Sequence, residues 1–539
     1  MIASKSSVFP EAGGLPEDVG NFTPCHQRIY LCGGELRAWR GAAQEVFSPA
    51  GVRRNGAFEP LPLGSYPLLS AAAAQECLAA AAQAFNSGAG EWPMMSVEER
   101  IACVQEFCAL MARQREEVVL RLMLEIGKSR EDAAAEFDRT VKYICDTVEA
   151  LKDLDRISSR FVIESGIVAQ IRRAPLGVVL CMGPFNYPLN ETFTTLIPAL
   201  IMGNTVVFKP AKFGVLLLEP LLEPFRRAFP AGVVNTVYGE GREVIAPIMR
   251  SGRVDCLAFI GSSRVADELK HLHPAPHRLR CVLGLGAKNP AIILADADLE
   301  VAIEECVLGA LSFNGQRCTA IKIIFVHETV AQRFVSGLSA AVDRLPRGMP
   351  WEAGVKITPL PEPGKCAALE HYVNDALAHG AQVINPGGGR WEETFFHPAV
   401  LYPVGGPMRI YHEEQFGPVV AAAPFSSLKV PVDYVINSPY GQQAAVFGRD
   451  PKEIARLVDP LVNQVCRVNI NSQCQRGPDV FPFTGRKDSA EGTLSVSDAL
   501  RVFSIRTLVA AKGTPQNKEI VNQIVKGRLS KFISNDFIL

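Results

Sequence analysis

One cysteine stands where a reactive thiolate would be built. Cys318 lies in a stretch of small and polar residues between two apolar segments, with Arg317 directly before it. A neighbouring cation lowers the pKa of a thiol from about 8.5 toward neutrality, and the thiolate is the form that attacks a carbonyl carbon. Taken alone, a cysteine is more often a buried packing residue. The motifs elsewhere in the chain favour the catalytic interpretation.

An asparagine on another segment offers a second part of such a site. Asn186 follows a β-rich run and lies between Pro184 and Pro188, which end the strand. Attack of a thiolate on an aldehyde produces an oxyanion, and the Asn186 amide and the Cys318 backbone N–H are donors that would stabilise it. An isolated asparagine in a turn usually caps its own backbone. The pair is therefore a hypothesis of covalent carbonyl chemistry.

Strands that alternate with helices must position these residues. Alternation of this kind predicts βαβ units and a parallel sheet, whose ligand crevice lies beyond the carboxyl ends of the strands. A second α/β block extends from residue 290 to about residue 495 and contains Cys318 near its start. The β-rich runs of the first block are residues 178–180, 205–208, 233–237 and 257–260, and those opening the second are 290–294 and 321–326.

The sequence predicts different structures for the two ends of the chain. Residues 1 to about 60 are rich in Gly and Pro and predict an irregular arm with one strand-like patch at 28–31. Helices follow to residue 150, and Ser96 with Glu99 forms a capping box at the start of one of them. In the tail, residues 513–539, apolar residues at helical spacing predict a docked surface helix.

Composition sets the class of protein. The 539 residues are 48% hydrophobic and 21% charged, which suits an enzyme of two or three domains. A formal net charge of −1 without a basic block offers nothing to nucleic acid or to an acidic membrane. Fourteen cysteines without CxxC pairs predict reduced thiols and a cytoplasmic location. No apolar run approaches the roughly 18 residues of a membrane span, so we expect a soluble protein.

Four motifs in this order resemble the aldehyde dehydrogenase superfamily, over about residues 28 to 510. They are Pro184-Phe185-Asn186-Tyr187-Pro188, Gly203-Asn204-Thr205-Val206-Val207-Phe208-Lys209-Pro210, Gly315-Gln316-Arg317-Cys318 and Glu414-Gln415-Phe416-Gly417-Pro418. The resemblance implies an α/β fold with a Rossmann-like cofactor domain, an α/β catalytic domain and a small β oligomerisation element. The expected boundaries are 1–155 with 175–285 for the cofactor domain, 286–495 for the catalytic domain, 156–174 with 496–512 for the oligomerisation element, and 513–539 for the tail.

The resemblance also implies roles for individual residues. Cys318 would be the nucleophile and Asn186 the oxyanion donor, while Lys209 and Glu414 would hold the two riboses of a nicotinamide cofactor. Backbone N–H groups near Gly-rich turns suit a pyrophosphate, above all at a helix N-terminus. The expected cofactor-binding residues are Lys209, Lys212, Gly239, Gly241, Gly261, Ser262, Glu414 and Phe416.

Lys212 bears on the choice of cofactor. Family members that prefer NAD often carry Glu at this position, where its carboxylate repels a 2′-phosphate. A lysine reverses the sign and would attract that phosphate through a charge-assisted hydrogen bond. We therefore expect NADP, with NAD possible. The competing interpretation is a solvated surface lysine.

Several cations imply an anionic substrate. Arg317 before the nucleophile and Arg476 in its segment resemble the non-phosphorylating glyceraldehyde-3-phosphate dehydrogenases, which bind a substrate phosphate through such residues. Arginine binds phosphate oxygens in a planar, bidentate way that lysine does not reproduce. The resemblance predicts oxidation of a phosphorylated aldehyde, glyceraldehyde 3-phosphate to 3-phosphoglycerate. The expected phosphate-binding residues are Arg139, Tyr187, Arg317 and Arg476.

One expected catalytic group is missing. The family usually places a glutamate where this chain has Gly284, and residues 269–295 contain no Asp or Glu. That carboxylate activates the water that hydrolyses the thioester, and general-base catalysis contributes about 10²- to 10⁴-fold. Three explanations remain open. Another carboxylate such as Glu268 or Glu414 reaches the water, a different acceptor takes the acyl group as in CoA-acylating semialdehyde dehydrogenases, or the protein is an impaired, cofactor-binding member of the fold.

Two further expectations concern metals and partners. His271, His273 and His277 form a cluster of the kind that binds zinc or nickel, but it lacks a nearby fourth ligand, so we expect an exposed loop and no metal site. Residues 161–171 and 496–512 resemble oligomerisation strands, whose unpaired edges a neighbouring subunit satisfies. We expect a homodimer or homotetramer.

Overall fold

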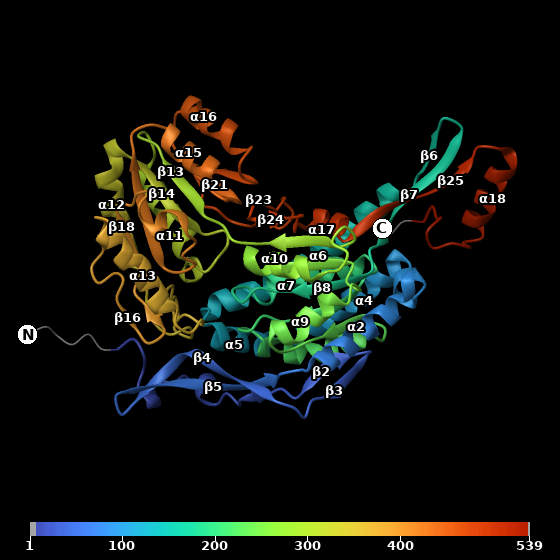
Figure 1. The fold of residues 1–539 in the computed structure, drawn as a ribbon, viewed down its shortest axis with the longest axis horizontal. Coiled ribbons are helices and arrows are strands. Elements are labelled where there is room, and N and C mark those ends of the chain that lie inside the picture. The colour runs from blue at the N-terminus through green and yellow to red at the C-terminus, as the bar shows by residue number, and fades with distance from the viewer. Residues whose placement is uncertain (1–6, 537–539) are drawn as a thin grey trace, which may run out of the picture.

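Two α/β bodies lie side by side, and a narrow strand arm projects from one of them (Figure 1). The computed structural model describes residues 7–536. Residues 1–6 of the predicted first domain and 537–539 of the predicted tail lie outside that range. The α/β architecture expected from the motifs is confirmed, with two sheets of mainly parallel strands.

The first body is built on a six-stranded sheet with the order β10-β9-β8-β11-β12-β24. The pairs from β10 to β12 are parallel, whereas β24 is antiparallel to β12. The order reverses between β8 and β11, which makes the space beyond their carboxyl ends the expected ligand crevice of a Rossmann-like sheet. The strands are β8 (Val178–Met182), β9 (Thr205–Lys209), β10 (Val234–Thr236), β11 (Cys256–Ile260), β12 (Arg280–Gly284) and β24 (Ala490–Glu491).

Helices bury both faces of this sheet. α7 (Asn190–Ile201) is buried along its whole length. α4 (Val97–Ala112) begins with the predicted capping box, in which the side chains of Ser96 and Glu99 each bond the other's backbone N–H. Within residues 7–536 no helix is long and apolar enough to cross a membrane. The other helices are α2 (Ala71–Phe85), α5 (Arg115–Ile126), α6 (Arg130–Ser158), α8 (Leu222–Ala228), α9 (Gly241–Arg250) and α10 (Ser263–Leu272).

The second body contains a seven-stranded sheet with the order β15-β18-β19-β14-β13-β21-β22, in which only the β15 pair is antiparallel. Cys318 lies between α11 and β14, as expected. The strands are β13 (Asn289–Ile293), β14 (Ile321–His327), β15 (Gln382–Val383), β18 (Ala399–Tyr402), β19 (Val419–Phe425), β21 (Gln443–Phe447) and β22 (Arg467–Ile470). The helices are α11 (Leu299–Leu311), α12 (Glu328–Asp343), α13 (Lys365–Ala378), α15 (Lys429–Asn437) and α16 (Pro451–Leu461).

The projecting arm consists of β6 (Phe161–Glu164), β7 (Ile167–Pro175) and β25 (Ser504–Lys512), paired antiparallel. Residues 496–502 were expected in this element but form a helix, α17 (Val496–Val502), whose Ala499 and Leu500 are buried in the core of the first body. α18 (Pro515–Lys526) follows the arm as the expected surface helix and buries no residue. That the arm joins subunits stays a prediction.

The expectation of an irregular N-terminal arm is wrong. β4 (Ala43–Arg54) and β5 (Ala57–Pro67) form a long antiparallel hairpin that runs along the first body (Figure 1). Asn55 and Gly56 have φ angles of 54° and 80°, which suits a two-residue hairpin turn of the kind that Asn-Gly favours. The prolines in β4 and β5 are typical of loops and obscured the strand pattern, although the Asn55-Gly56 pair is a hairpin signal that could have identified it.

The histidine cluster is a structural connection. His273 is buried, where its ring nitrogens bond the Val254 carbonyl and the Ala275 N–H. It is therefore not an exposed loop residue, although His271 and His277 are exposed. Among the described residues no group of three or more His, Cys, Asp or Glu side chains is arranged to hold a metal ion.

Asn204, from the second motif, joins four segments of the first body. Its side-chain oxygen accepts from the N–H groups of Leu176 and Gly177 at 2.7 and 3.0 Å. Its amide donates to the carbonyls of Ala199 and Phe503, both at 2.8 Å. The side chain is fully buried, so water would not replace these bonds. This motif residue supports the sheet rather than the chemistry.

Asn204→Ala should therefore lower the free energy of unfolding by about 3 kcal/mol, because each buried backbone group left without a partner costs about 1–3 kcal/mol. Urea denaturation followed by tryptophan fluorescence measures the change. Asn463→Ala is the matched control, since this exposed asparagine makes one bond to the Asp459 carbonyl. If the first unfolding transition occurs at the same urea concentration in Asn204→Ala and in Asn463→Ala, Asn204 does not stabilise the first body as described.

Candidate active site

A cavity of about 950 Å³ opens where the carboxyl ends of the first sheet face the loop that carries Cys318. Its lining comes from the turns after β8, β11 and β12, from the Cys318 loop and from residues 475–477. A volume of this size suits a small-molecule site. The predicted site residues that line it are Arg139, Asn186, Tyr187, Lys212, Gly261, Ser262, Arg317, Cys318, Glu414, Phe416 and Arg476. Lys209, Gly239 and Gly241 lie outside the lining.

The loop before Cys318 is backbone-strained. Phe313, Asn314 and Gly315 have consecutive positive φ angles of 47°, 56° and 69°; Phe rarely adopts this conformation, whereas Asn and Gly tolerate it. A Cβ at Gly315 would lie 2.7 Å from the Ala310 carbonyl oxygen, so only glycine fits. Asn314 is anchored by hydrogen bonds to the hydroxyl and the backbone N–H of Thr358. This strain places the Cys318 thiol at the cavity.

The electrostatics of Cys318 differ from the sequence expectation. Burial raises the pKa of its thiol, and the Glu191 carboxylate raises it further. Lys322 and a hydrogen bond with Gln442 oppose the rise but do not reverse it. The expectation that Arg317 lowers this pKa is wrong, because its guanidinium turns away and donates to the carbonyls of Leu308 and Gly309 at 3.3 and 2.8 Å.

Asn186 is held as an oxyanion donor would have to be. Its side-chain amide donates to the Gln316 carbonyl at 2.8 Å, two residues before Cys318. Its own carbonyl accepts from the Lys128 ammonium at 2.9 Å. One amide hydrogen is thereby fixed, which orients the other for a substrate oxygen. Sequence reasoning placed Asn186 correctly at the cavity but missed Lys128.

Lys128 connects several parts of the site. It is fully buried and paired with Glu136, and its ammonium lies 3.6 Å from the centre of the Tyr187 ring and 4.3 Å from that of Phe313. The Glu136 carboxylate also accepts from the N–H groups of Leu189 and Asn190 at the start of α7. The sequence feature that could have pointed to Lys128 is its place after Gly127, just before the start of α6.

The side chain of Ile260 lies close to the space that a side chain at position 284 would enter. Gly284 pairs with Ile260 across β12 and β11, and a Cβ at Gly284 would lie 3.3 Å from the Ile260 side chain. Glu268, one of the carboxylates proposed to replace it, is exposed on α10 and paired with Arg264 at 2.6 Å, outside the lining of the cavity. Glu414, the other, lines the cavity. Glu268 is therefore excluded as the replacement base, whereas Glu414 remains a candidate.

Charge at the other end of the cavity suits a phosphorylated dinucleotide. Ser262 caps α10, which presents its N-terminal N–H groups toward the lining formed by Gly261 and Ser262. Lys212 is exposed there. Burial lowers the pKa of Lys209 to about 8, with Glu240 opposing and Lys212 adding to the fall. Lys209 and Lys212 thus lie close enough to act on each other.

Glu414 is already engaged. It pairs with the buried Lys322, and its Oε1 also accepts from the Ala287 N–H at 3.2 Å. A Cβ at Gly286 would lie 2.8 Å from its Oε2, so the absence of a side chain at Gly286 gives this carboxylate its space. Lys322, on β14, was not foreseen from the sequence.

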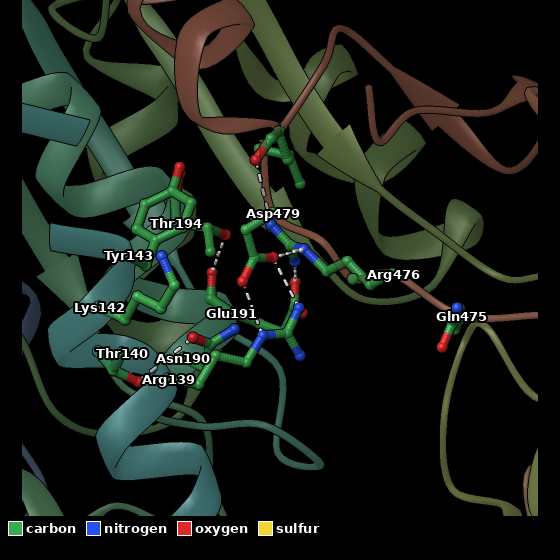
Figure 2. Close-up of polar contacts among 12 residues, drawn as sticks. Arg139, Thr140, Lys142, Tyr143, Asn190, Glu191, Thr194, Gln475, Arg476 and Asp479 are labelled. Carbon is green, nitrogen blue, oxygen red and sulfur yellow. Dashed lines mark hydrogen bonds and ion pairs between the residues drawn. The ribbon is translucent and has the colours of Figure 1, made fainter. Parts of the chain in front are cut away.

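The predicted phosphate-binding arginines are compensated by carboxylates (Figure 2). Arg139 makes a bidentate pair with Asp479 at 2.6 and 2.8 Å. The buried Arg476 pairs with Glu191 and lies 3.3 Å from Asp479. Burial raises the pKa of Asp479, but its bonds with Arg139 and the charge of Arg476 outweigh this and lower it. Together with Arg317, these groups leave one net positive charge.

This compensation was missed because charge partners depend on spatial neighbours. Glu191 and Asp479 both stand near residues that the motifs singled out, one five residues after Asn186 and the other three after Arg476. Burial of several cations near each other requires counter-charges, which is the signal that could have identified them.

The raised pKa of Cys318 predicts how the free enzyme reacts with iodoacetamide. The rate of Cys318 alkylation should rise about tenfold per unit between pH 7 and 9 and reach no plateau there, because a thiol with a raised pKa stays protonated in this range. Mass spectrometry of the Cys318 peptide at early times measures the rate. Glu191→Gln removes a negative charge beside the thiol and should move the profile to lower pH. A plateau near pH 7 would refute the assignment.

Comparisons with known proteins agree with this geometry. A model of the aldehyde dehydrogenase family matches residues 55–508. The chain is 34% identical over 84% of its length to an NADP-dependent glyceraldehyde-3-phosphate dehydrogenase of Streptococcus equinus, covering 92% of that protein, and 30% identical over 80% to one of Pisum sativum, covering 86%. The Bacillus halodurans NADP-dependent glyceraldehyde-3-phosphate dehydrogenase, crystallised with NADP, superposes with a TM-score of 0.83 at 30% identity, over 91% of this chain and 100% of that one. The chain belongs to the aldehyde dehydrogenase family.

Proposed function

We propose that this enzyme oxidises glyceraldehyde 3-phosphate to 3-phosphoglycerate with NADP. The observation that carries the proposal is the set of three arginines and one tyrosine around the cavity that holds Cys318. The names of the similar proteins support the same substrate and cofactor. Because Arg139 and Arg476 are paired with carboxylates, the substrate phosphate would share these arginines, whereas Arg317 has no ion-pair partner among residues 7–536.

The first half of the reaction uses Cys318 and Asn186. The Cys318 thiol loses its proton to solvent, the thiolate sulfur attacks the aldehyde carbon, and the oxygen becomes an oxyanion that the Asn186 amide and the Cys318 N–H stabilise. A single such donor contributes about 10²- to 10³-fold to the rate. Lys212, Glu414 and the N-terminus of α10 would hold NADP, which would supply the hydride acceptor. Oxidation leaves a thioester on Cys318.

The second half requires a water or another acyl acceptor. Gly284 provides no base, so hydrolysis needs another carboxylate as the base. Two alternatives to hydrolysis remain: transfer of the acyl group to a different acceptor, and an enzyme that does not release it. The Gly286-Ala287-Lys288-Asn289 run favours a CoA-acylating semialdehyde dehydrogenase as the second candidate, since such enzymes also lack the glutamate. An enzyme that cannot release the acyl group would be an impaired, cofactor-binding member of the family.

Rapid mixing of enzyme and NADP with glyceraldehyde 3-phosphate, followed by NADPH absorbance, tests the function. We expect a burst near one NADPH per active site and then a slower steady phase, because acylation precedes a deacylation step that lacks the usual base. Cys318→Ser should abolish both phases. Acceleration by added CoA would favour the acylating alternative, and the absence of any burst would refute the proposed substrate.

Lys212→Glu tests the cofactor assignment. The ratio of kcat/KM with NADP to that with NAD should fall by about tenfold or more, since a charge-assisted hydrogen bond contributes about 1.5–3 kcal/mol and the new carboxylate repels the 2′-phosphate. Initial rates at varied cofactor measure it. Lys452→Glu reverses an exposed charge on α16 and serves as the control. An unchanged ratio in Lys212→Glu would remove Lys212 from cofactor recognition.

A further inference from the structure

The missing base has a replacement candidate on the opposite wall of the cavity. We propose that Glu191 activates the water that hydrolyses the Cys318 thioester, an inference that rests on the thioester chemistry proposed above. Glu191 lies in the first turn of α7, five residues after the oxyanion donor Asn186. Both residues and Cys318 line the same cavity. The segment that leads into α7 thus carries Asn186 for the attack on the aldehyde and Glu191 for hydrolysis of the thioester.

Elimination among the cavity's carboxylates leads to the same residue. The acidic side chains that line the cavity within the described range are Glu191, Glu362 and Glu414. Glu362 lies 3.7 Å from Lys365, whose ammonium lies 5.9 Å from the centre of the Phe416 ring. Glu414 pairs with Lys322 and accepts from the Ala287 N–H through Oε1, as Glu191 pairs with Arg476, but the function proposed above assigns Glu414 to holding the cofactor. Glu191 also acts on Cys318 more strongly than any other charge does, Glu414 included.

The surroundings of Glu191 suit a fixed base. Its side chain is 11% exposed, and one oxygen, Oε2, pairs with Arg476. Among the residues that the structure describes, Oε1 has no hydrogen-bond partner. Figure 2 shows Glu191 extending from α7 toward Arg476, which Asp479 and the Leu494 carbonyl hold in turn. Arg476 therefore fixes the carboxylate and leaves one oxygen to accept a proton.

The step balances with water as its only co-reactant. The water oxygen attacks the acyl carbon of the thioester while Glu191 takes one of its protons. The carbon–sulfur bond then breaks, the sulfur leaves as the Cys318 thiolate, and the acyl group departs as a carboxylic acid that ionises in solvent. Glu191 returns its proton to solvent or to the thiolate. No oxidant or reductant is consumed.

A cofactor-independent experiment isolates this step. p-Nitrophenyl acetate acylates a reactive cysteine directly, so p-nitrophenolate absorbance gives a burst from acylation of Cys318 and a steady phase from its deacylation, whatever the natural aldehyde is. In Glu191→Gln the burst should remain and the steady rate should fall about 10²-fold or more, the usual contribution of a general base. Intact-protein mass spectrometry should then show acetyl-enzyme accumulating, and Cys318→Ser should show none.

Three further variants separate catalysis from structure. Glu191→Asp keeps a carboxylate and should restore part of the steady rate. Gly284→Glu in the Glu191→Gln background returns the family's carboxylate and should raise the rate at least tenfold; Ile260, 3.3 Å from the new Cβ, has to shift slightly. Glu268→Gln removes an exposed carboxylate outside the cavity and is the matched control.

The proposal is overturned by three results. A steady rate in Glu191→Gln equal to that of Glu268→Gln means that Glu191 is not the base. Loss of the burst in Glu191→Gln means that it supports acylation or folding instead. A wild-type protein that stays acetylated means that no competent base is present. If only the glyceraldehyde 3-phosphate assay fails, the proposed substrate is wrong. The p-nitrophenyl acetate experiment still tests the role of Glu191, because it does not use that substrate.

Discussion

The buried ion pair between Lys128 and Glu136 is the interaction on which the active site most depends. Neither side chain is exposed to solvent, so removal of one partner would leave an unpaired buried charge, at a cost of about 3–5 kcal/mol. Lys128 fixes the backbone of Asn186 and Glu136 fixes the start of α7. The pair therefore sets the positions of Asn186 and Glu191 together, and contacts the strained loop of Cys318 through Phe313.

Charge compensation is the second constraint. Arginines that recognise a phosphate must be partly buried to give specificity, but buried cations require partners when no substrate is bound. Here Asp479 and Glu191 supply them. The same arrangement that keeps Arg476 in place also holds a carboxylate near the thiol, so substrate recognition and acyl release would share one network (Figure 2).

Local patterns predicted much of the fold because they depend on neighbours in sequence. The strand runs that became β8 to β11, β13 and β14, the capping box at Ser96 and the position of Cys318 before β14 follow from apolar periodicity and turn residues, whereas β12 was not predicted. The N-terminal hairpin was missed because its prolines resemble loop sequence. α17 was assigned to the arm because residues 496–512 were taken together as an oligomerisation strand, whereas only β25 forms one.

The sequence by itself determined the two α/β blocks, the family, the candidate nucleophile Cys318 and the absence of the usual base at Gly284, since each depends on residue identity and order. Only the tertiary structure decided the charges. It turned Arg317 away from Cys318, paired Arg139 and Arg476 with carboxylates, excluded Glu268 and brought Glu191 to the thiol. Electrostatic interaction depends on distance and burial, and residues such as Glu191 and Arg476, nearly three hundred positions apart in the chain, meet only when it folds.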